Sequence, residues 1–275
     1  MGRWAIAAFA AAALVAVPSA TPQTVVGRTV SKSFVLRAGA TKSLSIACPR
    51  GYFALSAGAS KAGDGVAALA VRPLGLRTFG FRLSNAGKAG QRVAVVAACR
   101  KVRPAGAKRP YLRLKTLRRV TMSVPAAAQR QAHFTCPSAT VPAAGGFDVG
   151  RGDLSVRQET QDLHMLSFGV FNHGQTARTA SFYGSCLTVV RPPGASGAQL
   201  QVSLATDTVP VATGPQVVNR VCPRGWLSLA AGYSLPGGLD LNGAAAIGRT
   251  GRWSFTNPDQ KPVLAEVQLV CGRVS

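Results

Sequence analysis

Polar and apolar residues alternate in short stretches along most of the chain, and this pattern predicts β-strands with one buried face. Ser33–Leu36 and Ser43–Ile46 alternate in this way, and so do residues 81–83, 168–170 and 253–255, which read Phe-Arg-Leu, Phe-Gly-Val and Trp-Ser-Phe. Side chains two positions apart point to the same face of a strand, so each apolar pair faces a core. Beyond the N-terminus we find no long amphipathic helical pattern, and we expect an all-β protein.

The strands belong to a frame that occurs three times. Each copy opens with Cys-Pro, has a glycine ten residues later, and has an asparagine fourteen residues before a closing cysteine. In chain order, the opening cysteine, glycine, asparagine and closing cysteine are Cys48, Gly58, Asn85 and Cys99; Cys136, Gly146, Asn172 and Cys186; Cys222, Gly232, Asn257 and Cys271. Corresponding cysteines lie 88 and 86 residues apart, which predicts three units of similar structure.

All six cysteines fall in the frame, which favours one disulfide within each unit: Cys48–Cys99, Cys136–Cys186 and Cys222–Cys271. Each bridge closes a loop of about 50 residues and contributes roughly 4 kcal/mol in the chain-entropy model. Zinc is a weaker alternative, because there is no Cys-x-x-Cys pair and the first and third units contain no histidine. We expect no metal and no cofactor.

The predicted fold is three tandem small β-sandwich domains, immunoglobulin-like or related, each closed by one disulfide. A signal peptide occupies residues 1–20, and the domains span 21–104, 105–193 and 194–275. Proline and glycine follow the first two closing cysteines, as is typical of linkers. No tyrosine stands two residues before a closing cysteine, so the tyrosine corner of immunoglobulin domains is missing. A single closed three-fold barrel or propeller is the alternative.

Within each unit, the frame makes local predictions. The shared glycine marks a turn or bulge. The asparagine heads a turn, and the aromatic strand before it forms a hairpin with the strand that carries the closing cysteine. The aromatic residues Phe81, Phe168 and Trp253 belong to the core.

The N-terminus indicates export. Arg3 precedes an alanine-rich apolar run from Trp4 to Val17, and small residues near Ser19 and Ala20 supply a cleavage site. The run is too short for a transmembrane helix, which takes about 20 apolar residues, and no later stretch qualifies. We therefore expect a secreted, disulfide-bonded protein of the cell surface or envelope. An excess of arginine over lysine is typical of a GC-rich bacterial genome.

The formal net charge is +23, and its distribution is uneven. Residues 21–119 contain 20 basic side chains and one acidic side chain, Asp64. The densest run continues from the first unit through the linker into the second: Arg100, Lys101, Arg103, Lys108, Arg109, Arg113, Lys115, Arg118 and Arg119. This run predicts a basic face for an anionic envelope polymer or another polyanion, bound mainly by electrostatic attraction. An arginine-rich surface that serves only solubility is the alternative.

Sequence-specific recognition of nucleic acid is not expected, since aromatic residues are only 7% of the chain and the usual recognition motifs are absent. The main prediction is a non-catalytic binding or structural protein. A secreted enzyme or enzyme inhibitor is the second hypothesis, and it would act through the middle unit, which holds all three histidines, His133, His164 and His173. That hypothesis requires a histidine and a carboxylate to meet in a cleft.

Overall fold

The structure is a computed structural model that describes residues 27–61, 65–101, 111–115, 118–150, 152–191 and 199–274. Every regular element in these ranges is a β-strand, as the alternating pattern predicts. The predicted signal peptide lies outside the described residues. No described helix could cross a membrane.

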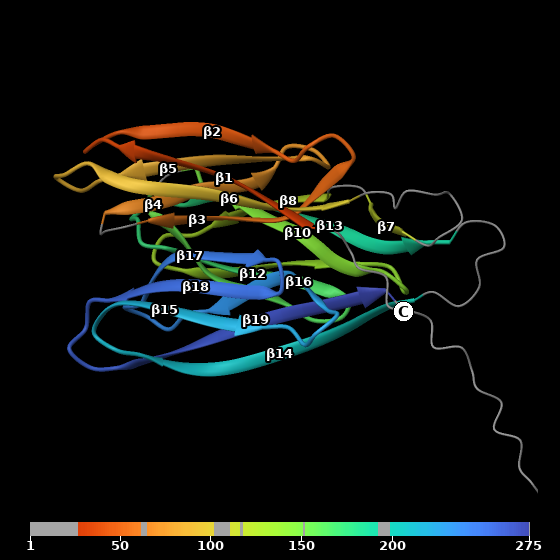
Figure 1. Cartoon of the computed structure of the whole chain (residues 1–275). Coiled ribbons are helices and arrows are strands. Elements are labelled where there is room, and N and C mark those ends of the chain that lie inside the picture. Colours follow the sequence, from red (N-terminus) through yellow and green to blue (C-terminus); the bar gives the residue numbers. More distant parts are fainter. Residues whose placement is uncertain are drawn as a thin grey trace, which may run out of the picture.

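Nineteen strands follow one another along the described chain (Figure 1). The first repeat contains β1 (Gly27–Leu36), β2 (Thr41–Ala47), β3 (Tyr52–Lys61), β4 (Val66–Pro73), β5 (Thr78–Asn85) and β6 (Gln91–Lys101). The second contains β7 (Tyr111–Leu114), β8 (Arg118–Val124), β9 (Gln129–Thr135), β10 (Val141–Asp148), β11 (Leu154–Gln161), β12 (Met165–Asn172) and β13 (Arg178–Val190). The third contains β14 (Leu200–Val211), β15 (Gly214–Val221), β16 (Leu227–Ser234), β17 (Asp240–Ile247), β18 (Thr250–Asn257) and β19 (Val263–Val274).

These strands pair in the same antiparallel order in every repeat. In the first repeat, β1, β6 and β3 form one set and β2, β5 and β4 form the other. The third repeat has the sets β14-β19-β16 and β15-β18-β17. In the second repeat β7 and β8 both pair with β13, in the place that β1 takes beside β6, and the remaining orders are β13-β10 and β9-β12-β11. The threefold frame in the sequence therefore corresponds to a threefold strand pattern.

The predicted hairpin between the aromatic strand and the cysteine strand is wrong. β5 pairs with β2 and β4, whereas β6 pairs with β1 and β3, so the chain crosses from one set of strands to the other between them. A buried asparagine holds this crossing. The Asn85 amide nitrogen donates to the carbonyl groups of Leu36 (3.0 Å) and Ala89 (2.9 Å), and its oxygen accepts from the Gly87 N–H (2.9 Å). Asn172 and Asn257 make the corresponding bonds.

All three predicted disulfides are confirmed: Cys48–Cys99, Cys136–Cys186 and Cys222–Cys271. Each bridge joins the residue that follows β2, β9 or β15 to the strand that ends the repeat, β6, β13 or β19. The aromatic residues Phe81, Phe168 and Trp253 are buried in the core, as predicted. Two of the three apolar clusters stay within one repeat, one in the second and one in the third. The largest is centred in the first repeat but also includes Leu187 and Val270, so the apolar interior runs across repeat boundaries.

Neighbouring repeats meet at the shared glycine. The predicted bulge lies at the glycine only in the second repeat, where the register shifts between Ala143 and Gly146. Gly58 and Gly232 are paired inside strands, two residues beyond a bulge. Gly58 on β3 lies against the Ala244 carbonyl on β17, Gly146 on β10 against the Val71 carbonyl on β4, and Gly232 on β16 against the Glu159 carbonyl on β11. A Cβ at any of the three would lie less than 3.0 Å from that carbonyl oxygen, so glycine is required by close approach of the next backbone.

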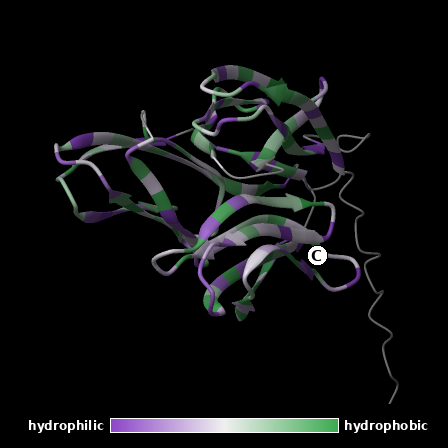
Figure 2. Cartoon of the chain, turned by 90° about the vertical axis from the view of Figure 1, so that its left-hand side faces the viewer, coloured by the Kyte–Doolittle hydropathy of each residue, from purple (hydrophilic) through white to green (hydrophobic). Residues whose placement is uncertain are grey.

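The same three places connect the repeats in a circle. β4 pairs with β10, and β11 pairs with β16, which extends the sheets from the first repeat to the second and from the second to the third. At the third junction, the Ser56 hydroxyl on β3 donates to the Ala246 carbonyl on β17 (3.3 Å). Accordingly, Figure 2 shows the strands gathered in three lobes around a common centre.

Candidate functional site

Two turns lie side by side at one end of the first repeat and present four exposed cations. The β1–β2 turn and the β5–β6 turn are joined by Asn85, whose N–H also donates to the Ala40 carbonyl (2.9 Å). We call the four cations the tip cluster, and they are Arg37, Lys42, Lys88 and Arg92. Lys42 lies over the Phe34 ring, with its amino group 4.5 Å from the ring centroid. Among the described residues, no carboxylate forms an ion pair with any of them.

The corresponding ends of the other repeats are not cationic in this way. In the second repeat, Arg178 is engaged by Asp153 in an ion pair. In the third repeat, the β18–β19 turn holds Asp259 close to Lys261. The tip cluster is thus a difference between repeats that otherwise share their fold. Its members come from separate turns and strands and form no continuous basic run, so no local sequence pattern indicates it.

The predicted basic run divides into three groups. Arg103, Lys108 and Arg109 lie outside the described residues. The side chains of five others are exposed, and we call them the linker cations: Lys101, Arg113, Lys115, Arg118 and Arg119. Arg119 is engaged on its own sheet, since its guanidinium donates to the Ser181 hydroxyl (3.0 Å) and lies over the Tyr183 ring. The remaining residue, Arg100, is buried.

Arg100 is only 1% exposed, so it is not available to a polymer at the surface. Its guanidinium donates to three carbonyl groups, those of Cys99 (3.2 Å), Ser228 (3.3 Å) and Gly248 (3.2 Å). Burial lowers the pKa of Arg100 to about 10, because the charged form loses its hydration. Arg100 therefore ties β6 of the first repeat to the third repeat.

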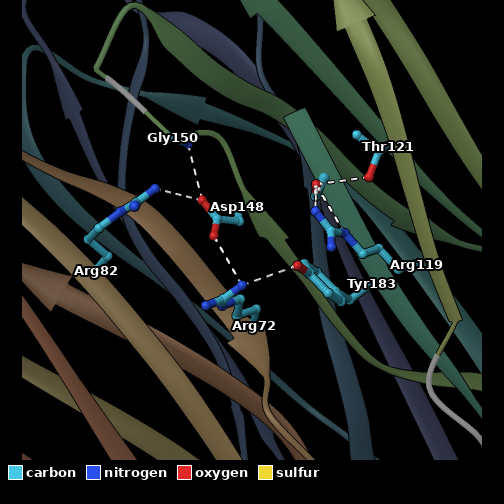
Figure 3. A network of polar contacts seen from close by, with 8 residues as sticks. Arg72, Arg82, Arg119, Thr121, Asp148, Gly150 and Tyr183 are labelled. Atoms are coloured by element: carbon cyan, nitrogen blue, oxygen red, sulfur yellow. Dashed lines mark hydrogen bonds and ion pairs between the residues drawn. The ribbon is translucent and has the colours of Figure 1, made fainter. Parts of the chain in front are cut away.

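A polar network joins the first and second repeats on the seven-stranded sheet (Figure 3). Asp148 on β10 accepts from Arg82 on β5 (2.6 Å) and forms an ion pair with Arg72 on β4 (3.3 Å). Arg72 also donates to the Tyr183 hydroxyl (3.3 Å), and this bond, followed by the attraction of Asp148, raises the pKa of Arg72. The network holds two cations of the first repeat against one acid of the second, so these arginines serve the junction.

The three histidines do not converge. His133 on β9 bonds to the Ser167 hydroxyl (3.0 Å), and His164 and His173 lie in the turns at opposite ends of β12. An eight-residue strand separates those turns, a distance of roughly 26 Å. The main-chain N–H of His164 donates to the Asp162 carboxylate (2.7 Å). Burial and the charge of Arg157 lower the pKa of His173, and Asp240 opposes them. The His173 ring also meets the Ser155 hydroxyl (2.9 Å).

No group of three or more metal-ligating side chains occurs among the described residues. The Ser155 hydroxyl accepts a hydrogen bond from the Arg157 guanidinium (3.0 Å), so it is held by two partners in an exposed position. A Ser–His contact of this kind lacks the hydrogen-bonded carboxylate that orients the base in known triads. The described residues therefore supply the contact between a serine and a histidine that the enzyme hypothesis needs, but no carboxylate hydrogen-bonded to that histidine.

No protein-family model matches the sequence, and no curated protein matches it significantly. Among solved structures, the chain is similar to one reported under the words "The Triple Jelly Roll Fold and Turret Assembly in an Archaeal Virus". The sequence identity is 9%, the TM-score is 0.23, and the alignment covers 92% of this chain and 90% of that chain. A TM-score this low supports no inference, so we argue function from this chain alone.

Proposed function

We propose that the protein is exported and binds an anionic envelope polymer, without catalysis, through the tip cluster of its first repeat. The observation that carries the proposal is the charge of that repeat: residues 27–101 contain thirteen Lys or Arg and one acid, Asp64. The tip cluster places four of these cations at two adjoining turns, Arg37 and Lys88 in the turns, Lys42 at the start of β2 and Arg92 at the start of β6. The linker cations would extend the contact more weakly, because they are spread over β6, β7 and β8.

Export is supported by the three disulfides, which form and persist in oxidising compartments. A signal peptide at residues 1–20 would account for that location. We further propose that residues 21–104, 105–193 and 194–275 are three sandwich-like domains that assemble around the common centre. In this arrangement the second and third domains hold the first in position at the surface where the polymer lies.

The proposal is tested by the retention of the disulfide-intact protein on a heparin column across a sodium chloride gradient. Three triple variants each remove three positive charges. The tip variant carries Lys42→Gln, Lys88→Gln and Arg92→Gln, the linker variant Arg113→Gln, Lys115→Gln and Arg118→Gln, and the control variant Arg224→Gln, Arg252→Gln and Lys261→Gln in the third repeat. All nine side chains are exposed, so the fold should tolerate each change.

We expect the tip variant to elute at the lowest salt concentration, the linker variant at an intermediate one and the control close to the wild type. Each lost contact with the polymer also reduces the number of counterions released, so the salt dependence of binding should become shallower in the tip variant. Equal shifts in all three variants would mean that net charge alone governs retention, and the proposed site would be wrong. Binding to cell-envelope fractions in the same salt series then tests the natural partner.

A further inference from the structure

A cavity of about 390 Å³ lies at the centre of the molecule, where the three repeats meet. It is lined mainly by β3 and β4 of the first repeat, β10 and β11 of the second, and β16 and β17 of the third, and it is open to solvent on one side. Small side chains line much of it, among them Ala57, Ala59, Ala68, Gly145 and Ala244. The volume falls in the range of small-molecule binding sites, about 300–1,000 Å³. The cavity exists because small residues stand where the strands of three repeats converge.

Two carboxyl groups line this cavity, that of Asp240 at an exposed position and that of Glu159 on β11. The groups nearest to one Glu159 carboxylate oxygen are uncharged: that oxygen lies over Gly145 on β10, beside Leu166 and Phe168 on β12. Among the described residues the carboxylate has no hydrogen bond and no ion pair. Burial therefore raises the pKa of Glu159 to about 7.

Tyr233 on β16 stands directly opposite Glu159 in the sheet and also lines the cavity. Only 3% of Tyr233 is exposed, and burial, together with the charge of Glu159, raises its pKa well above the usual value. Its hydroxyl stays protonated at physiological pH and can donate or accept a hydrogen bond. A carboxyl and a phenol are thus paired across two repeats inside a cavity that small and apolar residues line in large part.

The other two junctions show that the fold does not need this polar pair. Glu159 is paired with Phe168, and the equivalent aromatic residues Phe81 and Trp253 are paired with Val71 and Ala244, so Glu159 corresponds to Val71 and Ala244. Tyr233, directly after the shared glycine, corresponds to Phe147 and Ala59. At the junction of the first and second repeats, Val71 and Phe147 are opposite each other in the same register as Glu159 and Tyr233. Apolar pairs therefore satisfy the same position, and an unpartnered carboxyl there costs stability. A ligand whose positive charge pairs with the Glu159 carboxylate would offset that cost.

The chemistry of the cavity selects the class of ligand. A single carboxyl cannot replace the hydration shell of a divalent metal ion, which takes six or more oxygen ligands. An ammonium group needs fewer partners, and it can donate to the Glu159 carboxylate and to the Tyr233 oxygen at once. The alanine-lined walls then accept an apolar body. Arg157, His173 and Asp240 also line the cavity, and the exposure of His173 and Asp240 puts its opening to solvent there.

We propose that the central cavity binds a small organic amine, whose ammonium group pairs with Glu159 and Tyr233 and whose apolar body lies against the alanines of the first repeat. The site is independent of the tip cluster. Its specificity comes from the junction of the second and third repeats, where an acid and a phenol stand in place of an apolar pair.

Titration calorimetry with hexylamine at pH 8 tests the proposal, and hexan-1-ol serves as the uncharged probe of the same shape. We expect saturable binding of hexylamine and at least roughly tenfold weaker binding of hexan-1-ol, since a charge-assisted hydrogen bond is worth more than one decade in affinity. Non-specific attraction of the amine is unfavourable, because the protein carries a net charge of +23. Absence of hexylamine binding, or equal binding of the alcohol, would overturn the proposal.

Three variants locate the site. Glu159→Gln should weaken hexylamine binding roughly tenfold or more, whereas Glu266→Gln, the same change at the only other glutamate and away from the cavity, should leave it unchanged. Ala59→Phe should fill the cavity and abolish binding, and it should fold because Phe147 and Tyr233 occupy the corresponding positions. Binding by Glu159→Gln or by Ala59→Phe with wild-type affinity would show that the amine binds elsewhere.

Discussion

Corresponding positions of the three repeats hold the same residue in some cases and different residues in others. Positions that are alike in all three copies serve the fold, whereas positions that differ are free to acquire a function. The glycines and asparagines of the frame make the same contacts in each copy, so their role is to shape the fold. Where the copies differ, as at Glu159 against Val71 and Ala244, the shared fold does not explain the residue. The residues that take the place of Glu159 in the other two repeats show that the fold forms without a carboxyl group at this position.

Replacing a junction glycine should be costly. Gly146→Ala brings a Cβ against the Val71 carbonyl, whose strand cannot move without disturbing the pairing of β4 with β10. We expect a loss of about 1–3 kcal/mol or more in the free energy of unfolding, measured by urea denaturation. The matched control is Gly75→Ala, because nothing lies within 4 Å of that position, and it should change stability by less than about 0.5 kcal/mol. Equal effects of the two changes would contradict the close approach.

Glu159 should make stability depend on pH in a defined window. Its pKa is raised from 4.5 to about 7, so the folded state holds the proton more tightly than the unfolded state. Stability contributed by the protonated form is full below about pH 4.5 and is lost as the pH rises through about 7. Glu159→Gln removes this loss and should be more stable than the wild type at pH 8 by about 2–3 kcal/mol, but close to it at pH 5. Parallel stability curves for the two proteins between pH 5 and pH 8 would contradict this expectation.

At the scale of strands, the sequence predicted the strands and disulfides within each repeat, but not the contacts between repeats. Alternation located the aromatic strands and the cysteine spacing located the bridges, because both signals are local or repeated. The predicted hairpin was wrong because the alternation of polar and apolar residues indicates which face of a strand is buried but not which strand it pairs with. The tip cluster was missed because Arg37 and Arg92 are far apart in sequence, and only the bonds of Asn85 bring their turns together.

The junction between β4 and β10 should depend on Asp148. Asp148→Asn removes the charge that holds Arg72 and Arg82, and we expect a loss of about 1–2 kcal/mol that shrinks at high salt. Asp207 offers a matched control, since it pairs with Arg220 on the surface, where both side chains are more than 40% exposed. Asp207→Asn should cost no more than about 0.5 kcal/mol. Urea denaturation of both variants at low and high salt measures the difference.

The three repeats of the whole molecule are joined by buried contacts. The largest apolar cluster draws on all three repeats, and Arg100 links the first repeat to the third through buried hydrogen bonds. The sequence could not predict this continuity, because the same strand pattern suits separate domains as well as domains packed around a centre. Contacts between the repeats distinguish the two arrangements, above all the close approach of backbones at the three glycines and the pairing of β4 with β10 and of β11 with β16.

Thermal unfolding of the disulfide-intact protein should therefore show a single transition. We expect the calorimetric enthalpy to equal the van't Hoff enthalpy, which is the test for two-state behaviour. A destabilising change in the third repeat, such as Trp253→Ala, should lower the one midpoint and not split it. Two or three separate transitions would mean that the repeats unfold independently and that the junctions contribute little.

The position of Arg100 has a consequence for chain connectivity. Gly27, at the start of β1, packs against the Arg100 guanidinium, and Val274, at the end of β19, lines the same small internal space as Arg100. The two ends of the described chain therefore flank one buried side chain. A short covalent tether between them would close the backbone into a loop, and new termini could then be opened between any two repeats. A chain that began with the second or the third repeat could therefore form the same contacts between repeats as the natural order does.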